Sequence, residues 1–180
     1  MWNLPNSLTV FRIFLVPLLV VVLLTEIPDK EYWGLGIFLL AALTDALDGI
    51  IARRTNRITT TGAMLDPIAD KLLMSAAFIS LVELQQAPAW MVTLIVGREF
   101  AVTALRLIAL ERGVPISANR LGKAKTTSQV IAVSILIFGL ESNRWDAVGR
   151  VALWVALLLT VLSMIVYFWQ NRGVLAEDGA

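Results

Sequence analysis

Histidine and cysteine are both absent from the 180-residue chain. Their absence excludes imidazole acid–base catalysis, thiol nucleophiles, disulfides and the usual zinc sites. Charge is also scarce, because charged residues make up 16% of the chain and hydrophobic residues 58%, with a mean hydropathy of +0.77. Soluble domains are typically about 45–50% apolar. We therefore expect a chain surrounded mainly by lipid, whose chemistry is carried by carboxylates, Lys, Arg, hydroxyls and bound metal.

The apolar residues gather in six runs, each long enough to cross a bilayer as a helix of roughly 20 residues. They predict an all-α integral membrane protein, a six-transmembrane-helix bundle that forms one domain over residues 1–180. The expected spans are 8–25, 32–52, 62–84, 88–111, 123–140 and 147–169. The start, MWNLPNSLTVFR, predicts a short N-terminal interfacial amphipathic helix. The alternative is an ordinary helix start capped by Asn6 or Ser7.

Basic residues in the short connections predict how the bundle is oriented, because such residues favour the cytoplasmic side. The second and fourth connections carry most of them, whereas the opposite side has only Lys30 and Arg144. We therefore expect both termini and the polar site to face the cytoplasm from a cell inner (plasma) membrane. The residues behind this expectation are Arg53, Arg54, Arg57, Arg112, Arg120, Lys123 and Lys125.

Four aspartates interrupt the second and third apolar runs. At 100° per residue, Asp45 and Asp48 lie about 60° apart on one helix face, and Asp66 and Asp70 about 40° apart on another. Both pairs lie roughly 6–12 Å inside the same membrane surface, because the two helices run antiparallel through a short connection. The four carboxylates can therefore converge at one level of the membrane.

Four ionised carboxylates in a medium of low dielectric constant would repel one another and must be neutralised. Protonation is one remedy. Hard divalent cations such as Mg²⁺ or Mn²⁺ are the other, and paired metals are a recurrent device of phosphoryl chemistry. Helix capping or pairing with Arg53, Arg54 and Lys71 would explain one or two of these acids, and a cation pathway remains open. Such a pathway predicts acids spread across the bilayer, whereas these lie toward one side.

The stretch DALDGIIARRTNRITTTGAMLDPIAD, residues 45–70, resembles without departure the signature of the CDP-alcohol phosphotransferase family. The members of that family are membrane enzymes, typically with six spans and dimeric. They transfer a phosphatidyl-type group from a CDP-linked lipid to an alcohol and release CMP. The resemblance implies membrane and homodimer partners and no nucleic acid. The eight matching positions are Asp45, Asp48, Gly49, Ala52, Arg53, Gly62, Asp66 and Asp70.

The resemblance implies a role for each matching position. Two divalent metal ions, Mg²⁺ or Mn²⁺, would be the cofactors, and Asp70 would also be the general base toward the acceptor hydroxyl. The expected metal ligands are Asp45, Asp48, Asp66 and Asp70. The residues expected to line the CDP-lipid site are Gly49, Ala52, Arg53 and Gly62, although simple helix packing explains Gly49 and Ala52 equally well.

Three further stretches, NLPNSLTVFRIFLVP, VGREFAVTALRLIA and LGKAKTTSQ, resemble the family branch that joins CDP-diacylglycerol to sn-glycerol 3-phosphate. A phosphorylated acceptor needs fixed positive charge. The expected acceptor-phosphate set is Arg98, Arg106, Lys123 and Lys125. The alternatives are an ion pair of Arg98 with Glu99, snorkelling of Arg106, and membrane anchoring by the two lysines. Acceptors such as inositol phosphate, serine or phosphatidylglycerol also stay open at this point.

Overall fold

The computed structural model describes residues 4–55, 60–111, 120–141 and 145–170. Within these ranges, the side chains of residues 4–6, 46–55, 60–67, 111 and 120 lie outside the description. The described residues contain six α-helices and no strand. The helices are α1 Leu4–Leu24, α2 Lys30–Thr55, α3 Thr60–Glu83, α4 Ala89–Glu111, α5 Arg120–Phe138 and α6 Asp146–Gln170.

The all-α prediction is confirmed, and each expected span corresponds to one helix. The start of the chain differs from the prediction, because α1 continues without a break from Leu4 to Leu24 and no separate interfacial helix precedes it in the described residues. Pro5 does not interrupt the helix. It lies in the first turn, where backbone N–H groups have no acceptor within the helix, so the missing N–H of proline costs no hydrogen bond. Arg12 is fully buried, so this charged residue lies against the bundle and not in the membrane interface.

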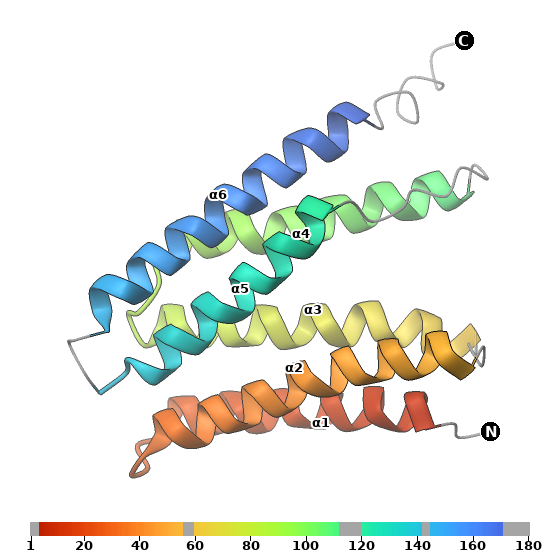
Figure 1. Cartoon of the computed structure of the whole chain (residues 1–180). Coiled ribbons are helices and arrows are strands. Elements are labelled where there is room, and N and C mark those ends of the chain that lie inside the picture. The colour runs from red at the N-terminus through yellow and green to blue at the C-terminus, as the bar shows by residue number, and fades with distance from the viewer. Residues whose placement is uncertain (1–3, 56–59, 112–119, 142–144, 171–180) are drawn as a thin grey trace.

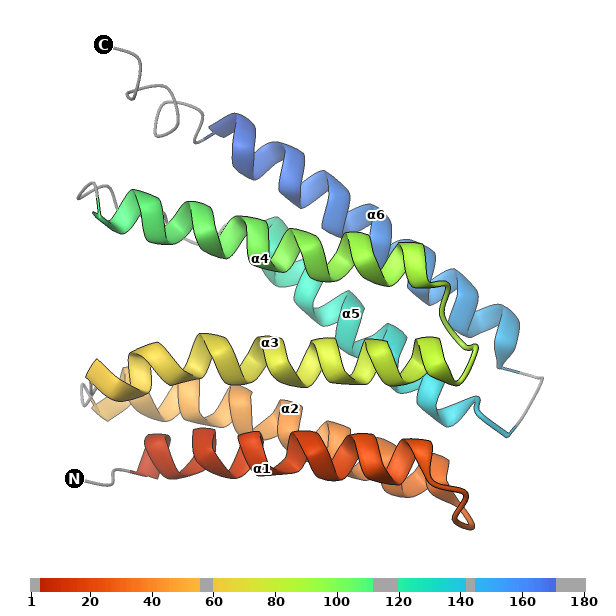
Figure 2. The same cartoon turned by 180° about the vertical axis from the view of Figure 1, so that it is seen from behind.

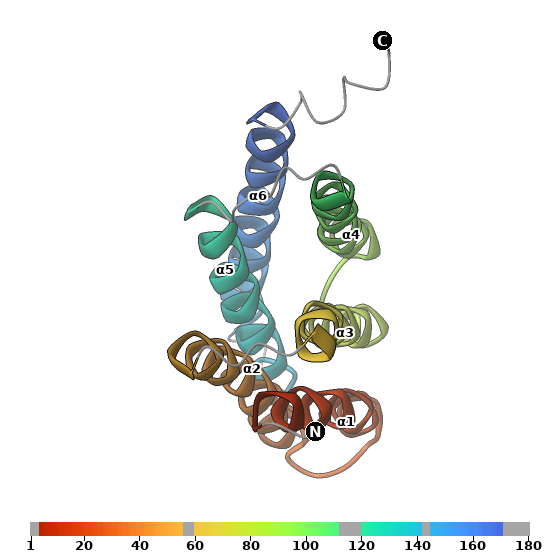
Figure 3. The same ribbon diagram turned by 90° about the vertical axis from the view of Figure 1, so that its right-hand side faces the viewer.

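The helices run back and forth between two ends of the bundle (Figure 1). One end gathers the start of α1, the end of α2, the start of α3, the end of α4 and the end of α6, and we call it the aspartate end because Asp45 and Asp70 lie toward it. Seen from behind, α1 and α3 lie side by side (Figure 2). The view along the bundle separates α3 and α4 from α5 and α6 (Figure 3).

Apolar side chains fill the centre of the bundle and also cover much of its outside. Leu19, Phe38 and Phe78 are fully buried in the main hydrophobic cluster. Phe14 and Trp169, in contrast, are each 70% exposed, and many other large apolar side chains also face outward. Such a surface suits lipid better than water.

Among the described residues, two helices are long and apolar enough to cross a membrane by length and composition alone. The segments are Ser7–Leu24 and Asp146–Gln170, with mean hydropathies of 2.6 and 2.5. Other helices carry charge inside their apolar runs, as α4 does with Arg98, Glu99 and Arg106. An intramembrane ionisable residue usually marks a functional site. The charged positions of these helices are therefore where a site is expected.

Helix α6 packs closely against α5, and Gly149 permits the contact. A Cβ atom at Gly149 would lie 2.7 Å from Leu136 Cδ2, whereas a Cβ atom at Gly36 would meet nothing within 4 Å. We expect Gly149→Val to destabilise the protein by about 1–3 kcal/mol through overpacking. Gly36→Val is the matched control. Thermal unfolding in detergent measures both variants, and equal shifts in midpoint would contradict the packing role of Gly149.

Candidate active site

A cavity of about 540 Å³ opens between α3, α4, α5 and α6. Its lining is rich in charged and hydroxyl side chains, which is unusual inside a bundle that is otherwise apolar. All four cations of the predicted acceptor set line it, together with Asp70, the predicted base. The lining residues are Asp70, Lys71, Arg98, Glu99, Val102, Thr103, Arg106, Gly122, Lys123, Lys125, Thr126, Thr127 and Tyr167.

The predicted metal ligands belong to the second half of α2 and the first half of α3. Asp45 and Asp70 are partly buried, and Asp70 lines the same cavity as Lys71 and Lys125. The predictions for six further positions fall on residues that are part of the two helices but whose side chains lie outside the description. These residues are Asp48, Gly49, Ala52, Arg53, Gly62 and Asp66.

Asp45 forms an ion pair with Arg12, which reaches it from α1. The distance from Arg12 Nη1 to Asp45 Oδ1 is 2.6 Å, and the Arg12 side chain is fully buried while that of Asp45 is 37% exposed. A buried guanidinium is costly unless a charged partner compensates it. The pair therefore fixes α1 against α2 and holds the Asp45 carboxylate in one orientation.

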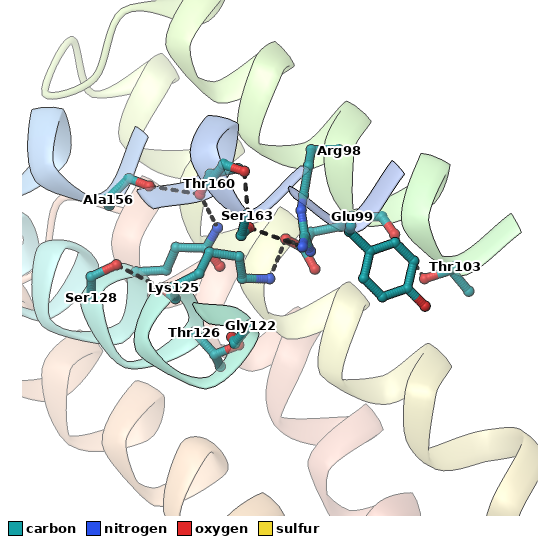
Figure 4. A network of polar contacts seen from close by, with 12 residues as sticks. Arg98, Glu99, Thr103, Gly122, Lys125, Thr126, Ser128, Ala156, Thr160 and Ser163 are labelled. Carbon is teal, nitrogen blue, oxygen red and sulfur yellow. Dashed lines mark hydrogen bonds and ion pairs between the residues drawn. The ribbon is translucent and has the colours of Figure 1, made fainter. Parts of the chain in front are cut away.

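Arg98 joins α4 to α6 at the wall of the cavity (Figure 4). Its Nη2 donates a hydrogen bond to Ser163 Oγ at 3.0 Å, and Ser163 in turn donates to the Thr160 carbonyl oxygen at 3.0 Å. Its Nη1 lies 3.3 Å from Glu99 Oε1. Its Nε is buried and has no hydrogen-bond partner among the described residues. A buried donor without a partner costs free energy of folding.

Lys125 brings a second buried cation to the same wall from α5. The Lys125 side chain is 5% exposed, and its ammonium group donates to Glu99 Oε1. One turn further along α5, Gln129 Nε2 donates to Thr160 Oγ1 at 3.0 Å. The contacts of Arg98, Lys125 and Gln129 therefore tie α4, α5 and α6 together around one polar centre.

Arg106 and Lys123 complete the cationic lining nearer the aspartate end. Arg106 Nε donates to Tyr167 Oη at 3.1 Å, and its guanidinium carbon lies 5.8 Å from the centroid of the Tyr167 ring. The contact orients the guanidinium through a hydrogen bond and a cation–π interaction. Lys123 is exposed at the start of α5. The four cations of the predicted acceptor set therefore line one cavity, and their joint role in binding a phosphate stays a prediction.

The donor set of the aspartate end fits a hard divalent cation, because carboxylate oxygens are the ligands that Mg²⁺ and Mn²⁺ prefer. Among the described side chains, no group of three acidic residues stands ready to hold a metal. Asp45 and Asp70 are described, and Asp48 and Asp66 belong to the same helices. A complete ligand set would therefore need all four aspartates.

Two residues of this region were not given a functional role by the sequence analysis. The sequence analysis assigns no role to Arg12, and it names Glu99 only as a possible ion-pair partner of Arg98. The signal for Arg12 was available, since an arginine inside an apolar run needs an acid on another helix. For Glu99, the available indication was its place next to Arg98 inside the apolar run of α4. Both side chains line the same cavity.

The fold and the cavity together describe a helical bundle with an apolar outside and an internal cavity lined by charged and hydroxyl side chains. Comparison with known proteins agrees. The family model described as CDP-alcohol phosphatidyltransferase matches residues 2–162. The chain belongs to this family.

Relatives from distant bacteria cover nearly the whole chain, and each is named CDP-diacylglycerol–glycerol-3-phosphate 3-phosphatidyltransferase. The Bacillus subtilis protein is 44% identical over 95% of this chain and 96% of its own length. The Rickettsia bellii protein is 40% identical over 92% of this chain and 93% of its own. The Salmonella choleraesuis protein is 37% identical over 98% of this chain and 99% of its own.

Proposed function

We propose that this protein transfers a phosphatidyl group from CDP-diacylglycerol to sn-glycerol 3-phosphate, giving phosphatidylglycerophosphate and CMP. The observation that carries the proposal is the cavity that joins Asp70 to the four cations Arg98, Arg106, Lys123 and Lys125. A reaction between a lipid-linked diphosphate and a phosphorylated alcohol needs a base and a phosphate-binding set side by side. The names of the bacterial relatives support the choice of substrates.

The cationic wall is proposed to bind the phosphate of the acceptor. Arg98 and Lys125 are buried there, so their charges act through a medium of lower dielectric constant than water. Arg106 and Lys123 lie at more exposed positions of the same cavity, where a solute from water would meet them first. The order of these cations favours entry of a small anion at the aspartate end and its retention at Arg98.

Asp70 is proposed to take the proton from the reacting hydroxyl of the acceptor. A carboxylate suits this task in a chain without histidine, provided that it lies within hydrogen-bond reach of the hydroxyl. Asp70 lines both the cation-rich cavity and a smaller space that shares Glu99 and Lys125 with it. An acceptor held by its phosphate would therefore present its far end toward Asp70.

Two divalent ions are proposed to be held by Asp45, Asp48, Asp66 and Asp70. When bound, such ions neutralise a diphosphate and stabilise the departing nucleotide monophosphate. The role of Arg12 is to orient Asp45 through the ion pair at 2.6 Å. Gly49, Ala52, Arg53 and Gly62 are proposed, from the family signature alone, to line the site of the CDP group.

We also propose that the aspartate end faces the cytoplasm of a cell inner membrane and that two copies of the chain associate. The orientation is supported by the basic residues in the connections at this end, which favour the cytoplasmic side. The dimer is supported by the family resemblance. Diacylglycerol tails could then stay in the bilayer while glycerol phosphate and CMP exchange with water.

Purified protein tests the reaction directly. The assay supplies CDP-diacylglycerol and Mg²⁺ or Mn²⁺, and measures CMP release with sn-glycerol 3-phosphate, inositol phosphate, serine and phosphatidylglycerol in separate reactions. We expect release with glycerol phosphate and little with the other acceptors. Release with inositol phosphate alone would overturn the choice of acceptor, and no release with any alcohol would overturn the reaction class.

Lys125→Ala should raise the KM for glycerol phosphate far more than the KM for CDP-diacylglycerol. The expected rise is on the order of 10- to 100-fold, the usual effect of removing a charged hydrogen bond. Lys30→Ala, which changes a lysine at the opposite end of the bundle, is the control. Initial rates with each substrate varied in turn separate the two KM values. Equal rises in the KM for both substrates would mean that Lys125 stabilises the fold and does not bind the acceptor.

A further inference from the structure

Glu99 places a second carboxylate, besides that of Asp70, inside a cavity whose other charged lining residues are all cations. It lies on α4 next to Arg98, and its side chain is 18% exposed. Both of its ion pairs, with Arg98 and with Lys125, use the same oxygen, Oε1. An acid at this position repels an incoming phosphate, so the proposed acceptor site contains a group that works against simple phosphate binding.

The carboxylate is held by Arg98 of its own helix and by Lys125 of α5 (Figure 4). Arg98 is fixed by its hydrogen bond to Ser163 on α6, and Lys125 approaches Glu99 from α5. Because both cations are buried, the anchored oxygen of Glu99 has little freedom to move. The second carboxylate oxygen of Glu99 is therefore held in a fixed position before a ligand binds. Such preorganisation lowers the entropy cost of recognising a specific ligand group.

The second oxygen, Oε2, has no recorded contact with any side chain in the described part of the protein. Glu99 lines the same cavity as Asp70, Arg106 and Lys123, and it also lines the smaller space next to Asp70. An ionised carboxylate only accepts hydrogen bonds, so the ligand group that meets Oε2 must be a donor. On a phosphorylated alcohol, that donor is a hydroxyl.

We propose that Glu99 recognises the non-reacting C2 hydroxyl of the acceptor and so selects a phosphorylated polyol over a simpler phosphorylated alcohol. The inference rests on the proposed function. Three groups of glycerol phosphate then meet three parts of one cavity. The phosphate meets the cations, the reacting hydroxyl meets Asp70, and the C2 hydroxyl donates to Glu99 Oε2.

An acceptor that lacks only the C2 hydroxyl tests the proposal. The wild-type protein is supplied with sn-glycerol 3-phosphate or with 3-hydroxypropyl phosphate, and kcat/KM is measured for each by CMP release. We expect a preference for glycerol phosphate on the order of 10- to 100-fold, because a charged acceptor would be left without its donor. Glu99→Ala should reduce this preference to near unity.

A purely structural role for Glu99 gives a different result, since loss of its ion pairs would weaken both acceptors alike. An unchanged preference in Glu99→Ala would therefore overturn the proposal, even if both rates fall. Glu83→Ala, which removes an exposed acid at the other end of the bundle, should keep both the rates and the preference. Thermal unfolding in detergent checks that each variant is folded.

Glu99→Gln provides a second test if the alanine variant does not fold. The amide keeps the size of the side chain but is a weaker hydrogen-bond partner than a carboxylate, so the preference should fall several-fold. No fall would contradict the proposal. A wild-type protein that releases CMP with both acceptors equally would overturn the role of Glu99 and leave the proposed reaction standing, whereas no release with any acceptor would overturn the reaction itself.

Discussion

Asp70→Asn is expected to lower the rate of CMP release by about 10²–10⁴-fold, the usual contribution of a general base. The amide has nearly the same shape as the carboxylate, but it cannot take a proton from the acceptor hydroxyl and is a poorer metal ligand. Asp70 lines the cavity that also contains Lys71 and Lys125, so the change acts where the acceptor is proposed to react. CDP-diacylglycerol binding should be retained in large part.

Asp29→Asn is the matched control for this experiment. Asp29 precedes α2 at the opposite end of the bundle and has a φ of 57°, a conformation that Asn tolerates well. The control should keep wild-type activity. An Asp70→Asn protein that turns over within tenfold of the wild type would exclude Asp70 as the base. If the variant loses CDP-diacylglycerol binding as well as activity, Asp70 acts mainly as a metal ligand.

The helices could be predicted from the sequence because each is an apolar run bounded by polar connections. Asp45 and Asp70 could be placed near one end for the same reason, since helical rise fixes the depth of a residue within its own helix. The cations on α4 and α5 were predicted from the need of a phosphorylated acceptor for positive charge. These cations and Asp70 line one cavity, whereas their binding of an acceptor phosphate stays a prediction.

Contacts between helices could not be predicted in the same way, because they depend on how each helix is rotated against its neighbours. The ion pair of Arg12 with Asp45 joins α1 to α2, and Glu99 receives Lys125 from α5. Neither pair follows from spacing along one helix. The inward rotation of Arg12 also explains why the start of α1 is part of the bundle and not a separate interfacial helix.

Removal of divalent metal is expected to abolish CMP release completely. Without the cations, the aspartates of α2 and α3 would repel both one another and the diphosphate of the lipid substrate. Addition of Mg²⁺ or Mn²⁺ should restore the rate.

Asp48→Asn should raise the metal concentration needed for half-maximal rate, because it removes one proposed ligand. Gly36→Val, at an open surface position far from the aspartates, should leave this concentration unchanged.

The most direct test of the whole account is therefore the rate of CMP release from CDP-diacylglycerol and glycerol phosphate in excess EDTA. The aspartates of two neighbouring helices are proposed to act through divalent ions, so the rate should fall to background and return when Mn²⁺ or Mg²⁺ is added beyond the chelator. A full rate in the presence of EDTA would contradict the account.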